Sequence, residues 1–475
     1  MRKFTQISDE PNIVYVSPKM IDDRIEASYY KKQYLDADEK IVTFNNGFIY
    51  LENLCTKITD GTHKTPDYKS EGIKFISAKN ILEDSIDFED IKYISEDEHN
   101  EISKRCKVKP EDILFTKIGR IGYAKVVPAN VSTFSIFVSV ALLKLKSNVD
   151  NRFIEAFLNS KYGRIQSERL VKGSNQPDFH LENIAEIKVP IPSSEIQKYI
   201  GDKVRRAEEL REEAKRLKKE AEEILKVELG FNILQVKLSV YKEKFSWIKT
   251  KELDDRMDGE FYKTDFILNN EHIDILKNNG VQVLRLKDII DKGSYGILPS
   301  SDDYGKGEVV LLRSTNLKEF LIDASDVIKV PECYYKEKVQ VNEGDILLEI
   351  KGQCYSGAIA TELKNKTIVN GSIYKFSVKK GFNNYYILAY LLSKSGQLQK
   401  QQNLANSIIS YLSIDCINNL KIPVVSMEKQ QIIGGKYKAY VEQMNKSKQL
   451  IQEAKQDVED LIEGNFDMSK VRANS

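Results

Sequence analysis

The feature that most constrains this sequence is an internal repeat. Asp112-Ile113-Leu114 returns 233 positions later as Asp345-Ile346-Leu347, and segments on either side keep nearly the same offset. The longest match has eight identities in sixteen ungapped positions, where Asn151, Ile154, Ala156, Leu158, Ser160, Lys161, Gly163 and Gln166 recur as Asn384, Ile387, Ala389, Leu391, Ser393, Lys394, Gly396 and Gln399. Shortly afterwards, Lys188, Pro190 and Gln197 recur as Lys421, Pro423 and Gln430. The sequence therefore predicts one structural unit repeated in tandem.

Each copy carries the same succession of elements. Short apolar runs predict strands at 73–77, 112–116 and 136–145, with counterparts at 308–313, 345–349 and 373–378. A short amphipathic helix, an extended segment marked by Pro, and a long helix follow in each copy. Strands with interspersed helices make each globular part α+β. Segments rich in Gly, Ser and Asn between the strands are predicted to be loops.

The long helices are predicted at 195–229 and in the matching position near the end of the chain. Their apolar residues recur in steps of three and four, the spacing of a coiled-coil seam. The seam residues are Ala207, Leu210, Ala214, Leu217, Ala221 and Ile224, and then Tyr437, Met444, Ile451, Ala454, Val458 and Leu461. We expect an antiparallel coiled coil with an internal pseudo-two-fold axis, each helix roughly 50 Å long. The alternative is two unrelated charged surface helices.

Composition limits the class of protein less than the repeat does. The net charge of +1 over 475 residues neither favours nor excludes a nucleic acid partner. Five Cys without CxxC spacing and four His without a ligand pattern predict no metal site. The absence of an 18-residue apolar run predicts no membrane association and a cytoplasmic location.

Several motifs, in order and duplicated, resemble the specificity subunits of type I restriction-modification systems. They are 57–66 (Lys-Ile-Thr-Asp-Gly-Thr-His-Lys-Thr-Pro), 72–80, Asp112-Ile113-Leu114 with Gly119 and Gly122, 173–177 (Gly-Ser-Asn-Gln-Pro), and 189–192 (Val-Pro-Ile-Pro) with Gln197. The second copy departs from this pattern, because it has Lys292-Gly293-Ser294-Tyr295-Gly296 in place of Asp60-Gly61-Thr62-His63. Two copies with the same strands and helices but different loops suit two modules that read different sequences.

The resemblance implies a non-catalytic subunit with two target recognition domains, each reading one half of a bipartite target in double-stranded DNA. The two helices would set the spacing and dock two methyltransferase subunits, with endonuclease and translocase subunits added outside. This chain would bind no cofactor, whereas S-adenosylmethionine, ATP and Mg would belong to the partners. The expected divisions are 1–194 and 233–427 for the recognition domains, 195–232 and 428–466 for the spacer helices, and 467–475 for a flexible tail.

Loop residues supply the candidate DNA contacts. Arg, Lys, Asn, Gln, Ser and Thr read base edges or hold phosphates. In the first copy the candidates are Lys57, Thr59, Thr62, His63, Lys64, Lys79, Asn80, Lys117, Arg120, Lys172, Ser174, Asn175 and Gln176. In the second they are Tyr295, Ser300, Ser301, Arg313, Ser314, Asn316, Lys351, Gln353, Tyr355, Asn406 and Ser407.

Catalytic motifs are missing from the sequence. There is no Pro-Pro for an amino-methyltransferase loop and no Gly-Lys-Ser/Thr for a P-loop. Glu349 and Lys351, with Glu332 upstream, have the spacing of a nuclease site, but the first copy has Thr116 in place of the Glu349 carboxylate. Three alternatives remain: the recognition subunit of another methylation-based phage-defence system, an interaction scaffold without DNA binding, and a nuclease that uses Glu349.

Overall fold

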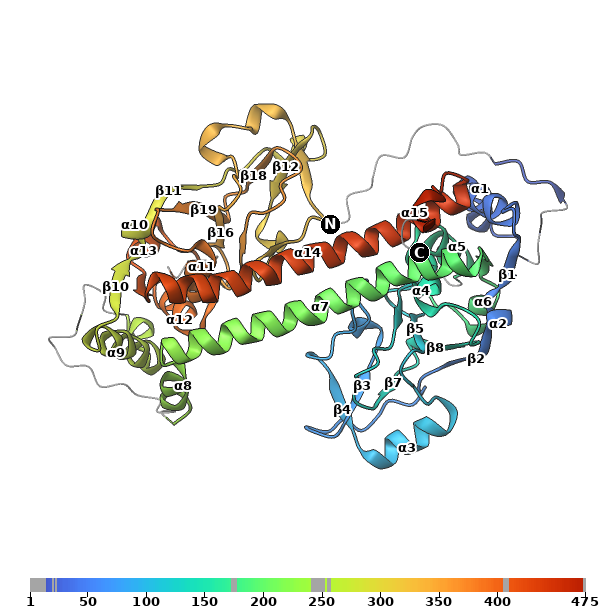
Figure 1. Ribbon diagram of the computed structural model, residues 1–475, viewed down its shortest axis with the longest axis horizontal. Helices are drawn as coiled ribbons and strands as arrows, with labels where there is room; N and C mark the ends of the chain where they lie inside the picture. The colour runs from blue at the N-terminus through green and yellow to red at the C-terminus, as the bar shows by residue number, and fades with distance from the viewer. Residues whose placement is uncertain are drawn as a thin grey trace. The chain divides into compact units, whose positions relative to one another are not determined.

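The computed structural model describes residues 14–18, 21, 24–171, 177–240, 253, 258–404 and 410–472. The chain forms two compact units: unit 1 comprises 1–210 and 445–475, and unit 2 comprises 211–444. The two longest helices, α7 (Ser194–Glu228) and α14 (Met427–Glu463), contribute residues to both units (Figure 1).

The described part of unit 1 has three small sheets, in strand orders β2-β8-β5-β6, β4-β3-β7 and β1-β9. Its strands are β1 (Phe48–Tyr50), β2 (Cys55–Asp60), β3 (Ile73–Ile76), β4 (Lys92–Ile94), β5 (Ile113–Thr116), β6 (Ala124–Val126), β7 (Phe134–Ile136), β8 (Val140–Leu145) and β9 (Lys188–Pro190). Its helices are η2 (Ala27–Tyr30), α1 (Lys32–Val42), α2 (Leu51–Leu54), η3 (Ala78–Asn80), α3 (Glu96–Arg105), α4 (Asn151–Asn159), α5 (Lys161–Leu170), α6 (Leu181–Ala185) and α15 (Ser469–Arg472).

Unit 2 repeats this plan in the sheets β11-β19-β16-β17, β15-β12-β18 and β10-β20, with the short pair β13-β14 added. Its strands are β10 (Gln282–Arg285), β11 (Ile290–Tyr295), β12 (Val309–Leu312), β13 (Leu317–Lys318), β14 (Leu321–Ile322), β15 (Ile328–Val330), β16 (Ile346–Glu349), β17 (Gly357–Ile359), β18 (Thr367–Val369), β19 (Ile373–Val378) and β20 (Lys421–Val424). Its helices are α8 (Phe231–Val240), η5 (Gly259–Tyr262), α9 (Thr264–Asn278), α10 (Leu286–Ile289), η6 (Ser301–Asp303), η7 (Ser314–Asn316), η8 (Glu332–Tyr334), η9 (Glu337–Val339), α11 (Asn384–Leu392), α12 (Lys394–Gln402) and α13 (Ile414–Asn418).

Side-chain hydrogen bonds are duplicated along with the topology. The Gln166 amide donates to the carbonyl of Lys188 and accepts from its backbone N–H, both at 2.9 Å. Gln399 makes the same two bonds with Lys421 at 2.8 Å. Since each pair ties a helix of the globular part to the strand that precedes a long helix, the predicted duplication is confirmed at the level of individual contacts.

The paired helices at the centre of each copy begin and turn for the same local reasons. Asp150 caps α4 and Asn383 caps α11 by accepting backbone N–H bonds. A Cβ at Gly163 would lie 2.3 Å from the carbonyl oxygen of Phe157, so the tight turn from α4 into α5 requires glycine. Gly396 meets the same obstacle in unit 2.

The long helices pair antiparallel inside each unit. In unit 1, Lys203 forms an ion pair with Asp457, and Ser447 donates to the carbonyl of Ala207 at 2.7 Å. In unit 2, Lys436 lies 2.6 Å from Glu220. The predicted seam residues Ala207, Leu210, Ala214, Ala221, Tyr437, Ile451, Ala454 and Val458 are buried, whereas Leu217, Ile224, Met444 and Leu461 are half-buried.

Two expectations are corrected by the structure. The predicted strand at 136–145 is two strands, β7 and β8, because the chain turns between Phe137 and Ser139. The expected flexible tail is partly helical, since α15 buries Val471 in the core of unit 1 and Lys470 lies 3.1 Å from Asp457. Among the described helices, none is both long enough and apolar enough to cross a membrane.

Candidate functional site

Three of the predicted DNA-contacting stretches of unit 1 meet at one edge of its sheets. Asp60 at the end of β2 and Phe115 near the end of β5 both lie opposite Ala141 of β8. The Ser139 hydroxyl accepts the backbone N–H of Ala78 at 3.0 Å, and its carbonyl accepts that of Lys117 at 2.9 Å. The loops after β2, β3 and β5 are therefore held together around the start of β8.

A buried carboxylate lies at the centre of this edge. Asp60 accepts a bond from Arg105 at 2.9 Å, lies 3.6 Å from the ammonium of Lys117, and contacts the His63 ring at 3.1 Å. Lys117 also lies 3.2 Å from Asp178. Because Asp60 is buried, its carboxylate contacts these three basic side chains rather than solvent.

The next residue, Gly61, permits the close packing of this loop. A Cβ there would lie 2.0 Å from the carbonyl oxygen of Ile136, and a Cβ at Gly296 would lie 2.2 Å from that of Asn370. Thr62 and Ile297, which follow these glycines, form equivalent parallel bridges to Phe137 and Asn370. Gly61 and Gly296 are thus structural counterparts, which places Tyr295 at the position of Asp60.

The corresponding edge of unit 2 has the same frame and different chemistry. Tyr295 and Leu348 both lie opposite Tyr374, and the N–H of Ile350 donates to the carbonyl of Ser372 at 2.9 Å. Asp60, Lys117 and Asp178 of unit 1 correspond to Tyr295, Ile350 and Tyr411. A charged cluster on one frame is therefore replaced by aromatic and aliphatic side chains on the other.

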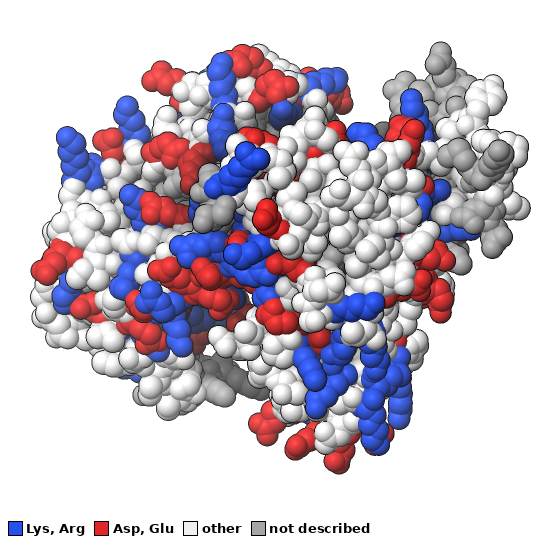
Figure 2. Space-filling view, turned by 45° about the vertical axis from the view of Figure 1, so that its right-hand side comes forward, with Lys and Arg blue, Asp and Glu red and all other residues white. Residues whose placement is uncertain are grey.

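Ten of the candidates that the structure describes are exposed. They are Lys57, His63, Lys64, Lys79 and Arg120 in unit 1, and Ser300, Ser301, Lys351, Gln353 and Tyr355 in unit 2. Thr62, Tyr295, Arg313 and Ser314 are half-buried, and Arg313 lies 2.9 Å from Asp326. Figure 2 shows Lys and Arg side chains gathered on the part of unit 1 that carries β3, β4 and α3.

Four candidates are buried, which corrects the expectation for two of them. Asn80 accepts the N–H of Ser77 and donates to the carbonyl of Asp90, and Asn316 does the same with Arg313 and Asp323. These two amides are committed to the fold, so we remove them from the surface expected to meet DNA. Thr59 and Lys117 are also buried, the latter in the ion pairs described above. Lys172, Ser174, Asn175, Gln176, Asn406 and Ser407 lie outside the described residues.

Arg105 is a site residue that no sequence pattern indicated. It stands at the end of α3, far from Asp60 in sequence, and its half-exposed guanidinium bonds Asp60 and the carbonyl of Gly61. No local motif marks such a residue, because only the folded strand order brings α3 beside β2.

The residues that suggested a nuclease site have structural roles instead. The Glu349 carboxylate accepts the N–H of Ser356 at 3.0 Å, and the Thr116 hydroxyl accepts the N–H of its counterpart Tyr123 at 2.8 Å. Glu332 pairs with Lys366. Glu349 thus closes a loop as Thr116 does, and the described residues contain no group of three or more His, Cys, Asp or Glu suited to a metal ion.

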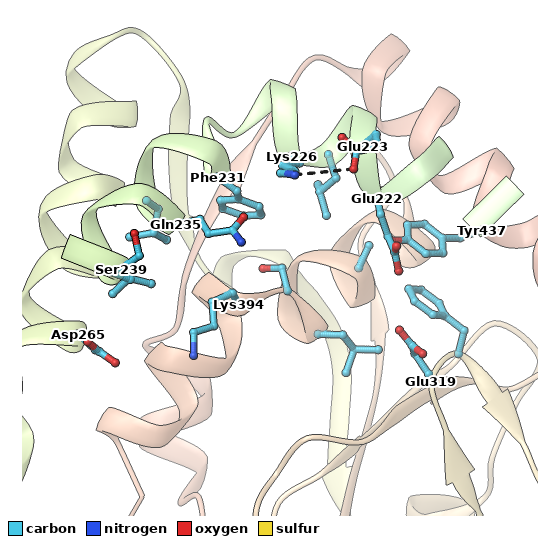
Figure 3. A pocket seen from close by; sticks show the side chains of 17 residues that line it. Glu222, Glu223, Lys226, Phe231, Gln235, Ser239, Asp265, Glu319, Lys394 and Tyr437 are labelled. Atoms are coloured by element: carbon cyan, nitrogen blue, oxygen red, sulfur yellow. Dashed lines mark ion pairs between the residues drawn. The ribbon is translucent and has the colours of Figure 1, made fainter. Parts of the chain in front are cut away.

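A cavity of about 740 Å³ in unit 2 is lined by α7, α8 and α11 (Figure 3). Phe231, Leu234 and Tyr437 supply apolar walls, while Glu222 and Glu319 lie at the same end of the cavity. Among the described residues, four carboxylates and two ammonium groups line it, which is unfavourable for a phosphate backbone.

Comparisons with known proteins agree with this arrangement. The family model described as "Type I restriction modification DNA specificity domain" matches residues 48–223 and again 278–456. The chain belongs to this family. It contains two specificity domains, one from each repeat, and members of the family recognise DNA without catalysing its modification.

Solved structures similar to this specificity protein include the following three. The S subunit from M. genitalium is 12% identical, with 89% of this chain and 97% of that chain covered at a TM-score of 0.45. A chain from a study of type I complex assembly and conformational transition is 14% identical (88% and 98% covered, TM-score 0.30). The HsdS subunit from Thermoanaerobacter tengcongensis is 13% identical (88% and 96% covered, TM-score 0.25). No curated protein sequence matches the chain significantly.

Proposed function

We propose that this specificity protein directs a type I restriction-modification complex to a bipartite DNA sequence, with unit 1 reading one half and unit 2 the other. One observation carries the proposal: two domains of the DNA specificity family share strand order and frame hydrogen bonds, but differ where their loops converge. Asp60 and Lys117 in unit 1 occupy the positions that Tyr295 and Ile350 occupy in unit 2. Different side chains on one frame suit two different half-sites.

The proposed partners are two methyltransferase subunits, with endonuclease and translocase subunits joining them in the cytoplasm. The long helices support a docking role, because their outer faces carry exposed residues of both signs, such as Arg206, Glu209, Glu212 and Lys215. S-adenosylmethionine would be bound by the methyltransferase, and ATP and Mg by the endonuclease. This chain supplies recognition only.

The exposed candidates for DNA contact in the described part of the chain include five Lys or Arg residues, namely Lys57, Lys64, Lys79, Arg120 and Lys351. With so few cations at the candidate site, this chain by itself should bind duplex DNA weakly and mostly through phosphates. Each neutralised phosphate adds close to one to the steepness with which the logarithm of the binding constant falls against the logarithm of the salt concentration. Sequence selectivity then requires the methyltransferase subunits to close around the same duplex.

Titrations of duplex DNA at two salt concentrations, with and without the co-expressed methyltransferase, test this proposal. We expect weak, salt-sensitive binding by the chain alone and selective binding by the complex. Mapping of modified bases in host DNA, with and without the gene for this chain, identifies the target. Tight, salt-insensitive specific binding by the chain alone, or a modification map that does not change when the gene is removed, contradicts the proposal.

A further inference from the structure

One loop of the four-stranded sheet is tied to a helix in both units. In unit 1 this is the β5–β6 loop, residues 117–123, and in unit 2 it is the β16–β17 loop, residues 350–356. Both loops carry exposed candidates for DNA contact: Arg120 in the first, and Lys351, Gln353 and Tyr355 in the second. Their conformation therefore decides where these side chains point.

In unit 1, a cation from α5 holds the β5–β6 loop. The Arg164 guanidinium donates to the carbonyl of Ile121 at 3.0 Å and lies 3.4 Å from the ring centre of Tyr123. Arg120 lies over the same ring at 4.3 Å. Two cations thus share the Tyr123 ring, one fixed from the helix and one exposed at the surface.

In unit 2, a different cation holds the equivalent carbonyl. Lys400 of α12 is fully buried and its ammonium donates to the carbonyl of Cys354 at 2.5 Å. Cys354 is the counterpart of Ile121, and its φ of 55° is unusual for a residue other than glycine. Lys400 therefore bonds the peptide at the strained point of the loop.

The two cations occupy different helix positions. Arg164 corresponds to Gln397, and Lys400 corresponds to Ser167, one helical turn further on. Gln397 donates to the carbonyl of Tyr355 at 3.1 Å, whereas the Ser167 hydroxyl donates to the carbonyl of Gly163 within its own helix. The function of holding the loop is kept, but the residue that performs it has moved by one turn.

We propose that Arg164 and Lys400 are positioning residues that set the half-site preference of unit 1 and unit 2 respectively, each by holding the carbonyl of one loop residue. The inference rests on the proposed function, since it assumes that each loop faces one half-site. Fixing a loop before DNA arrives favours one arrangement of its contacts, and loss of that order lowers discrimination between correct and altered sequences.

The test uses the full chain assembled with its methyltransferase, in the variants Arg164→Met and Lys400→Met. Lys161→Met and Lys394→Met are matched controls, because these exposed lysines occupy equivalent first positions of α5 and α12. Hydrogen exchange reports loop order for 117–123 and 350–356, and exchange of the β2–β8 and β11–β19 pairs reports whether the unit remains folded. Modification mapping reports discrimination at each half-site.

We expect Lys400→Met to speed exchange in 350–356 and to reduce discrimination roughly tenfold in one half-site only. Arg164→Met should do the same for 117–123 and the other half-site, and the controls should change neither. If the unmodified complex is sequence-selective but a variant loosens its loop without changing its half-site, or changes both half-sites equally, the positioning role is wrong. If the unmodified complex shows no sequence selectivity, the proposed function fails instead.

Discussion

The ammonium of Lys117 lies 3.6 Å from the carboxylate of Asp60, and both side chains are almost fully buried. Neither charge is essential to this frame, because the counterparts in unit 2 are Ile350 and Tyr295. The pair fills the edge of unit 1 where the loops after β2, β3 and β5 meet. It is stable only while both charges are present, because an isolated buried charge is costly.

Removing either charge alone should therefore lower the free energy of unfolding by more than half of the loss caused by removing both. We expect Lys117→Met to lower the free energy of unfolding by about 1–3 kcal/mol, because Asp60 keeps Arg105 but loses its buried partner. In Asp60→Asn/Lys117→Met the loss should be smaller than the sum of the single losses by about 1 kcal/mol or more. Urea unfolding of the full chain measures the four proteins. Strict additivity contradicts a coupled pair.

Lys400 predicts a pH dependence that its removal abolishes. Burial lowers the pKa of Lys400 to about 8, below the ordinary value of 10.5. The unfolded chain then holds more protons than the folded chain between these values, so stability rises as pH increases from about 8 to 10.5. The rise between pH 7.5 and 9.5 should exceed that of Lys400→Met by roughly 2 kcal/mol. Equal changes in the free energy of unfolding for both proteins contradict a lowered pKa of Lys400 in the folded chain.

Exchanging one recognition domain should change one half-site. Replacing residues 22–186 with the first module of another family member keeps the long helices, so the second half-site and the gap should remain. Modification mapping of host DNA with the hybrid measures all three. A hybrid with both half-sites altered is incompatible with independent modules.

The length of the paired helices is predicted to set the gap between half-sites. Inserting seven residues between Leu210 and Arg211 and seven between Met444 and Asn445 keeps the seam in phase and lengthens each helix by roughly 10 Å. Since B-DNA advances about 3.4 Å per base pair, the gap should grow by about three base pairs with both half-sites unchanged. Inserting two residues at each point rotates the seam by roughly 200° and should abolish modification. An active heptad variant that keeps the original gap shows that the helices do not set the distance between the half-sites.

The sequence predicted the repeated strands, helices and their internal contacts better than it predicted the candidate DNA contacts. Identities such as Gln166 and Gln399 mark contacts that the fold needs twice, so the internal repeat by itself singles them out. Asn80 and Asn316 were misassigned because an amide that bonds backbone has the same chemistry as one that reads a base. Their burial decides between these roles, and burial depends on the packing of η3 and η7 against distant residues.

Residues that act from a distance could not be predicted at all. Arg105, Arg164 and Lys400 contact loops that lie 43 to 46 positions away in the chain. Their roles follow from strand order and helix rotation, which a single sequence does not specify. The shift of the loop-holding cation by one turn between α5 and α12 also hides it from the repeat, since the aligned positions pair Arg164 with Gln397 and Ser167 with Lys400.

The composition of unit 1 has a consequence for synthesis. Unit 2 is one continuous stretch, whereas the core of unit 1 also takes Ile451, Ala454, Val458 and Val471, which follow unit 2 in the sequence. Domains fold as the ribosome releases them, in order from the N-terminus. Here residues from Asn445 onward, which are synthesised after all of unit 2, complete the core of unit 1, so a chain that stops before Asn445 leaves apolar surface of unit 1 uncovered. Only chains that extend through these residues bury that surface, so unit 1 is completed only after unit 2 has been synthesised.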